Sequence, residues 1–158
     1  MKIIVVSDSH GNLRALSKAL CDYHADLYIH LGDGERELDT ICRQYPDKQI
    51  YHVCGNCDYA SLSEEELLLS PDDKNVIFAV HGHRYNVRYT LEQLKEAAGR
   101  KGANIVLYGH THARHNEYDN GMYIINPGSV SAPRDGNRPS FAVIELLPKG
   151  IITNIVDL

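Results

Sequence analysis

Apolar and polar residues along the chain follow two periods, one typical of buried strands and one typical of helices. Residues 2–7 form a continuous, mostly apolar run rich in β-branched side chains, which indicates a strand buried on both faces. After it, Leu13, Leu16 and Leu20 recur at the i, i+3 and i+7 positions of a helix. Asn12 stands just before this stripe and can cap the helix. The pattern therefore predicts a strand followed by a helix whose leucine face packs on a sheet.

The same order continues along the chain. An apolar strand is predicted over 26–31, a short charged helix over 35–44 and another strand over 49–54. A β-α-β-α-β order is typical of parallel strands, whose carboxyl ends meet at one edge of a sheet. Short loops at such an edge are where α/β proteins bind ligands.

The second half of the chain predicts hairpins and one more helix. A hairpin is expected about the turn at 71–75, because apolar segments flank it. A helix is expected over 90–102, with Leu91, Leu94 and Ala98 on its apolar face. The remaining apolar segments predict a strand over 104–109, a hairpin around Asn120–Gly121, and two strands over 140–146 and 151–156.

At 158 residues the chain has the length of one domain. No linker, repeat or low-complexity segment divides it, so we expect a single domain over residues 1–158 with two packed sheets and helices on the outside. The first apolar run is too short for a signal peptide or a membrane span. A cytoplasmic protein with four free cysteine thiols is therefore expected.

The formal net charge is −5, and no run of Lys or Arg is present. Non-specific nucleic-acid binding depends on clustered cations that neutralise phosphates, so this composition argues against a nucleic-acid groove. A small anionic substrate stays compatible with the composition if its site is locally positive. The sequence leaves the oligomeric state open, a homo-oligomer included.

Cys54 and Cys57 have the Cys-x-x-Cys spacing of a redox pair or of half a zinc site. No second such pair is present to complete a zinc ribbon. A redox pair is expected at the start of a helix, where the helix dipole lowers a thiol pKa, whereas these residues follow a predicted strand. Asn56, which lies between them, is the more informative residue.

Residues that can bind a metal follow five of the predicted strands, and glycines stand beside nearly all of them. Seven ligands are too many for one tetrahedral ion, but they suit two ions that share a carboxylate. Asp33 is the natural shared ligand. The seven candidates are Asp8, His10, Asp33, Asn56, His81, His110 and His112.

The short motifs around these residues are DSHGN at 8–12, GD at 32–33, GNCD at 55–58, HGH at 81–83 and GHTH at 109–112. Together they resemble the calcineurin-like metallophosphoesterases, and NPGSVSAPRDG at 126–136 resembles the small YfcE-type phosphodiesterase branch. The resemblance covers residues 3–147. It implies an αββα sandwich of two mixed β-sheets flanked by helices, with a dinuclear centre at the carboxyl ends of the strands.

The resemblance also implies how the ligands divide. One ion would take Asp8, His10, Asp33 and His112, and the other would take Asp33, Asn56, His81 and His110. Mn²⁺ is the first choice of metal, and Fe²⁺, Zn²⁺ or Ni²⁺ also suit mixed oxygen and imidazole ligands.

The expected function is hydrolysis of a phosphate ester, favouring a diester, by in-line attack of a hydroxide that bridges the two ions. The expected catalytic residues are Asp33, Asn56, His112, Cys57 and Asp58. Cys57 stands where many family members carry a His that can protonate the leaving group. A thiol can donate a proton but supplies no positive charge, which predicts a modest catalyst. Asp58 is expected either to orient a ligand or to end a turn.

Arg84 and Arg134 are candidates for contacts with the substrate phosphate, because a guanidinium can bind phosphate with two hydrogen bonds. For each of them an ordinary surface position is an equal alternative. The functional alternative to an enzyme is a metal-binding scaffold for protein–protein interaction, as in the retromer subunit that resembles this branch. The presence of all seven candidate ligands favours the enzyme.

Overall fold

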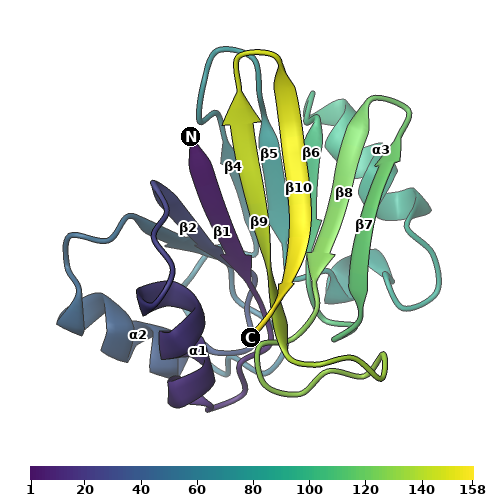
Figure 1. Cartoon of the computed structure of the whole chain (residues 1–158). Coiled ribbons are helices and arrows are strands. Elements are labelled where there is room, and N and C mark those ends of the chain that lie inside the picture. Colours follow the sequence, from purple (N-terminus) through teal and green to yellow (C-terminus); the bar gives the residue numbers. More distant parts are fainter.

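The computed structural model describes residues 1–158 and contains two five-stranded sheets, three α-helices and one short 3₁₀ helix (Figure 1). The helices are α1 (Leu13–Cys21), α2 (Glu35–Gln44), α3 (Glu92–Arg100) and the 3₁₀ helix η1 (His83–Tyr85). The strands are β1 (Lys2–Val6), β2 (Leu27–His30), β3 (Ile50–His52), β4 (Glu66–Leu69), β5 (Ile77–Val80), β6 (Ile105–Tyr108), β7 (Arg114–Asp119), β8 (Met122–Pro127), β9 (Ser140–Leu147) and β10 (Gly150–Asp157).

Both sheets are mixed. The first has the order β10-β9-β1-β2-β3. In it, β1, β2 and β3 are parallel, β9 pairs with β1 in the antiparallel direction, and β10 pairs with β9 in the same way. The second has the order β4-β5-β6-β8-β7, in which β5, β6 and β8 are parallel. The two predicted hairpins are confirmed as the antiparallel pairs β4–β5 and β7–β8, and the last two predicted strands form a third antiparallel pair, β9–β10.

Three apolar clusters separate four layers of structure. The largest lies between the sheets and includes Val5, Ile29 and Leu107. A second packs α1 and α2 against the first sheet, and a third packs α3 against the second sheet. Figure 1 shows the helices on the outer faces of the two sheets. The predicted αββα sandwich is confirmed.

One predicted core residue is exposed. Asn12 caps α1 as expected, since its Oδ1 accepts the Ala15 N–H at 3.0 Å. The buried face of α1 is centred on Leu16, with Ala19 and Leu20 beside it. Leu13 lies in the first turn at the margin of this face and is 41% exposed, so its prediction as a core residue was wrong.

The remaining predicted elements differ from the structure only at their ends. The third strand is shorter than predicted, and α3 begins at Glu92 rather than at Thr90. Leu91 therefore lies before the helix, although it still packs on the third cluster. None of the helices has the length and apolar character needed to cross a membrane.

The exposure of Leu13 gives a stability prediction. Leu16→Ala is expected to lower the free energy of unfolding by about 2–5 kcal/mol, because it leaves a cavity in the core. Leu13→Ala is expected to change it by less than about 0.5 kcal/mol. Urea unfolding followed by circular dichroism measures both, and equal losses for the two variants would contradict the packing described for α1.

Candidate metal centre

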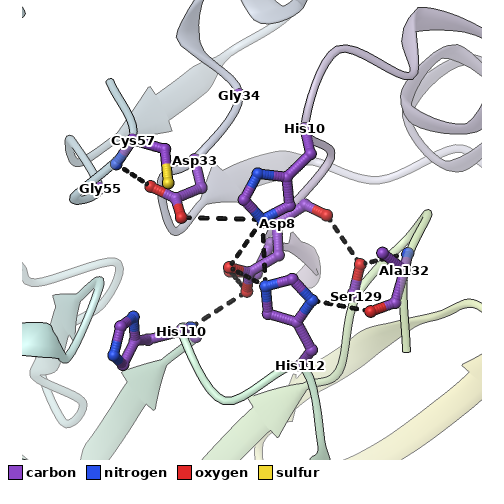
Figure 2. A network of polar contacts seen from close by, with 12 residues as sticks. Asp8, His10, Asp33, Gly34, Gly55, Cys57, His110, His112, Ser129 and Ala132 are labelled. Atoms are coloured by element: carbon purple, nitrogen blue, oxygen red, sulfur yellow. Dashed lines mark hydrogen bonds and ion pairs between the residues drawn. The ribbon is translucent and has the colours of Figure 1, made fainter. Parts of the chain in front are cut away.

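The seven candidate ligands come together at the carboxyl ends of the parallel strands. Those from the first sheet follow β1, β2 and β3, and those from the second follow β5 and β6. Because these strands are parallel within each sheet, their following loops meet at one edge of the sandwich. Figure 2 shows several of these side chains turned toward one another from different loops.

A first group of donor atoms surrounds Asp8. Its Oδ1 lies 3.2 Å from His112 Nε2 and 3.8 Å from His10 Nε2. The two imidazole nitrogens are 3.0 Å apart. His10 Nε2 is also 3.7 Å from Asp33 Oδ2, which joins Asp33 to the group.

A second group of donor atoms surrounds His81. Its Nε2 lies 3.4 Å from Asp33 Oδ2, 3.1 Å from Asn56 Oδ1 and 3.3 Å from His110 Nδ1. The Asn56 amide nitrogen points the other way and donates to Cys57 Sγ at 3.2 Å, so the amide oxygen is left for the group. Asp33 Oδ2 is common to both groups.

The protonated nitrogen of two of the histidines follows from their backbone partners. His81 Nδ1 lies 2.7 Å from the carbonyl oxygen of Leu31, and His112 Nδ1 lies 2.7 Å from that of Ala132. A carbonyl can only accept, so each Nδ1 carries a hydrogen, and a ring in its neutral form presents the lone pair of Nε2 to the centre. These rings are oriented in the way that metal-binding imidazoles commonly are.

A buried carboxylate oxygen in the first group has no hydrogen-bond donor. Asp8 is fully buried, and its Oδ2 accepts from Ser7 Oγ at 2.6 Å and from the His110 N–H at 3.0 Å. Its Oδ1 has no hydrogen-bond partner. Such a group costs free energy unless something satisfies it. Oδ1 faces imidazole nitrogens rather than an amide or hydroxyl donor, so a cation fits this position.

The electrostatics of the centre agree with cation binding. Burial opposes ionisation of Asp33, but hydrogen bonding and charge interaction with His81 outweigh it and hold the pKa of the carboxyl well below its ordinary value. Asp8 shows the same direction, since its interactions with His112, His81 and Ser7 outweigh burial and lower its pKa. Both carboxyls are therefore ionised at neutral pH and available as ligands.

The loops that carry the candidate ligands are strained. Only eight non-glycine residues in the chain have a positive φ, and five of them belong to the two donor groups. The backbone of a residue that has a Cβ rarely adopts this left-handed conformation, which costs about 1–3 kcal/mol in unfavourable cases. The five are Asp8, His10, Asp33, His110 and His112. Short sharp turns are thus used to bring side chains from separate strands to one point.

Asp58 holds two of these loops in place. Its two carboxylate oxygens accept four backbone N–H groups, at distances of 2.7 to 3.0 Å. Three of the donors lie in the loop that carries Asp33, and the fourth is Gly55. The two loops are in close contact, since a Cβ at Gly55 would lie 2.1 Å from Asp33 Oδ1. Asp58 therefore positions the backbone around Asp33 and Asn56.

A buried relay that the sequence analysis did not identify joins the loops after β1 and β2. His30 is fully buried, and its Nδ1 accepts the Gly32 N–H at 3.0 Å. Its Nε2 then donates to Ser9 Oγ at 3.3 Å, and that hydroxyl donates to Glu37 at 2.7 Å. Burial lowers the pKa of His30 to about 4, so this ring stays neutral. Apart from the acidic residue near the start of α2, no sequence signal points to this relay.

The other sequence-predicted residues lie at the edge of the centre. The Cys57 N–H donates to Asp33 Oδ1 at 2.7 Å, and its Sγ lies near His10 and Asp33. All four cysteines are free thiols. Arg84 forms an ion pair with Glu65, and Arg134 is exposed, with its backbone N–H bonded to the His112 carbonyl at 3.0 Å. Neither guanidinium forms a hydrogen bond or an ion pair with the donor groups, and the ion pair of Arg84 is with Glu65.

Comparisons with known proteins show the family of the chain. The family model described as the calcineurin-like phosphoesterase superfamily domain matches residues 1–148. The chain is 34% identical over 150 residues to "Probable metallophosphoesterase YsnB" of Bacillus subtilis, covering 92% of this chain and 85% of the relative. It is 29% identical over 170 residues to phosphodiesterase YfcE of Escherichia coli, covering 92% and 88%.

Solved structures show the same fold. A conserved Streptococcus pneumoniae protein described as a predicted phosphoesterase matches with a TM-score of 0.87 and 28% identity, over 99% of this chain and 88% of that one. Vps29 of Entamoeba histolytica, solved in complex with Zn²⁺, matches with a TM-score of 0.76 over 99% of each chain. At 20% identity the second likeness concerns the fold alone.

The bonds of Asp58 give a prediction for metal affinity. Asp58→Asn replaces one acceptor oxygen with an amide group that cannot accept backbone N–H groups, so the loops around Asp33 and Asn56 lose alignment. We expect Mn²⁺ affinity, measured by calorimetry, to fall by about 10–100-fold.

Asp72→Asn is the matched control, because Asp72 also accepts backbone N–H groups but lies in the exposed β4–β5 turn. It is expected to leave Mn²⁺ affinity unchanged. Equal affinity in the wild type and Asp58→Asn would show that Asp58 does not position the centre.

Proposed function

Because the chain belongs to the calcineurin-like phosphoesterase superfamily, we propose that it is a metal-dependent phosphodiesterase that acts on a small phosphate ester in the cytoplasm. In this proposal the whole chain forms one catalytic domain and binds two divalent ions, with Mn²⁺ as the first choice. Phosphodiesterase activity is favoured over monoesterase activity because one of the relatives, 29% identical, is named a phosphodiesterase.

The observation that carries the proposal is the pair of donor groups that share Asp33 Oδ2. We assign the first ion to the group around Asp8 and the second to the group around His81. In both groups acceptor atoms face other acceptor atoms, an arrangement that a cation between them stabilises. The proposed ligands of the first ion are Asp8, His10, Asp33 and His112, and those of the second are Asp33, Asn56, His81 and His110.

The ions, when bound, would lower the pKa of a water molecule and stabilise charge on the phosphoryl oxygens. The chain's own residues hold the ligand atoms in the positions that this chemistry needs. Asp33 fixes the two groups relative to each other, and His81 and His112 keep their Nε2 lone pairs turned inward through their backbone bonds. His112 and Asn56 thus contribute to catalysis in the proposal as ligands that hold the reacting groups in place.

Cys57 suits proton donation better than nucleophilic attack. Burial and the nearby Asp33 carboxylate raise the pKa of its thiol to about 11, so the thiolate is scarce at neutral pH. A protonated thiol beside Asp33 can give its proton to a leaving oxygen. A leaving group of low basicity needs this proton donation least. We therefore propose that the chain prefers esters with good leaving groups.

The two arginines contribute unequally to the proposal. Arg84 is paired with Glu65, so a phosphate would have to compete with that carboxylate. Arg134 has no ion-pair partner, and it lies two residues after Ala132, whose carbonyl oxygen accepts a hydrogen bond from His112. It is therefore the better candidate for a phosphate contact. The alternative function, a metal-binding scaffold, is supported by the shared fold with Vps29.

The first test removes and restores the metal. Protein stripped with a chelator is expected to lose hydrolysis of bis(4-nitrophenyl) phosphate and to regain it with Mn²⁺. Asn56→Ala and His81→Ala are each expected to lower kcat/KM by more than about 100-fold. This loss is larger than the usual loss of activity when a residue that hydrogen-bonds a metal ligand is replaced.

Asn154→Ala and His24→Ala are matched controls, because both residues are exposed outside the centre. Neither is expected to change kcat/KM. Protein that binds two ions but hydrolyses neither this diester nor 4-nitrophenyl phosphate would favour the scaffold over the enzyme.

A second test concerns Cys57. Cys57→His introduces a group that can be both protonated and positively charged near the leaving oxygen, so we expect kcat for esters of poorly acidic alcohols to rise by about tenfold. Cys57→Ala, which removes the proton donor, is expected to lower kcat most for esters of poorly acidic alcohols. A loss of activity in Cys57→His equal to that in Cys57→Ala would show that this position does not serve the leaving group.

A further inference from the structure

A cavity of about 600 Å³ opens directly beside the metal centre. Its inner wall includes His10 and Asp33, which belong to the two donor groups. The start of α2 and residues 57–59 also line it. A group esterified to a phosphate at the centre can therefore extend into this cavity.

The carboxylates along the cavity are bonded to the protein itself. Asp58 accepts four backbone N–H groups. Glu37 accepts from Ser9 Oγ at 2.7 Å and from the Gly11 N–H at 2.6 Å. Glu35 accepts from Ser61 Oγ at 2.9 Å and also from Ser63 Oγ. These three acidic side chains line the cavity, and their charge disfavours a second anionic group on the ligand.

Two side chains in the cavity have no protein partner. Arg36 is exposed on α2, and no carboxylate forms an ion pair with it. Tyr59 is 88% exposed and lies in the loop that follows Asp58. That loop is fixed at both ends, by Asp58 on one side and by the bonds from Ser61 and Ser63 to Glu35 on the other. An aromatic ring and a guanidinium without protein partners therefore both line this cavity.

We propose that Tyr59 and Arg36 form a binding site for an uncharged aromatic substituent of the phosphate ester, such as a nucleoside. The ring of the substituent stacks on Tyr59, and the guanidinium of Arg36 covers its other face. The negative walls exclude substituents that carry a further phosphate. This inference rests on the proposed phosphodiesterase activity and assigns its substrate class.

The test compares two symmetric diesters, so that the cavity receives the same group whichever ester bond breaks. Bis(4-nitrophenyl) phosphate carries two aromatic rings, and bis(2,2,2-trifluoroethyl) phosphate carries none. For each enzyme variant, kcat/KM is divided by the wild-type value for the same ester, which cancels the different reactivities of the esters.

Tyr59→Ala is expected to lower this ratio about tenfold for the aromatic ester and to leave it near one for the alkyl ester. Tyr59→Phe is expected to keep the wild-type ratio for both, because it keeps the ring. Arg36→Gln is expected to lower the aromatic ratio about threefold.

Two controls match these substitutions outside the cavity. Tyr89→Ala removes another exposed ring, and Arg43→Gln removes another arginine of α2, one that pairs with Asp39. Both are expected to leave both ratios unchanged.

The inference is overturned if Tyr59→Ala lowers both ratios equally or lowers neither. It is also overturned if the two controls reproduce the effects of the cavity variants. Wild-type protein that hydrolyses neither diester with Mn²⁺ present would instead contradict the proposed function, so the two failures are distinguishable.

Discussion

The Asp33 carboxylate joins the two donor groups, because its Oδ2 lies 3.7 Å from His10 Nε2 and 3.4 Å from His81 Nε2. These two histidines come from different sheets, so the carboxylate also links the two halves of the sandwich at its functional edge. Asp33 itself is fixed by two hydrogen bonds. Its backbone N–H donates to Asp58, and its side chain accepts the Cys57 N–H. Its Oδ2 is thus the carboxylate oxygen that contacts both donor groups.

The surrounding structure compensates the strain of this arrangement. Left-handed residues after three strands cost free energy, and each is held by bonds to another loop. The His10 N–H donates to the Asp33 carbonyl at 2.9 Å, and the His110 N–H donates to Asp8. Glycines at 32, 55 and 109 leave the space that these contacts need, because a Cβ at any of them would lie within 3 Å of a neighbouring atom. The loops around the centre thus support one another.

Much of the fold follows from local patterns in the sequence. Apolar runs such as 2–7 predict buried strands because only burial between layers suits them, and polar residues after those strands predict the candidate site. The exposure of Leu13 could not be predicted, since it depends on which part of α1 meets the sheet. The positive φ of His10 and the relay from Ser9 to Glu37, 28 residues apart, depend on contacts between loops that no local pattern records.

Electron paramagnetic resonance of Mn²⁺-loaded protein can show whether the chain holds two cations that share one carboxylate, as we propose. Two Mn²⁺ ions bridged through Asp33 are predicted to give an exchange-coupled spectrum, with hyperfine lines at half the spacing of an isolated ion. Asp33→Asn, which weakens the shared ligand, is predicted to remove this coupling. Saturation at one ion per chain, with only the spectrum of isolated Mn²⁺, would contradict the account.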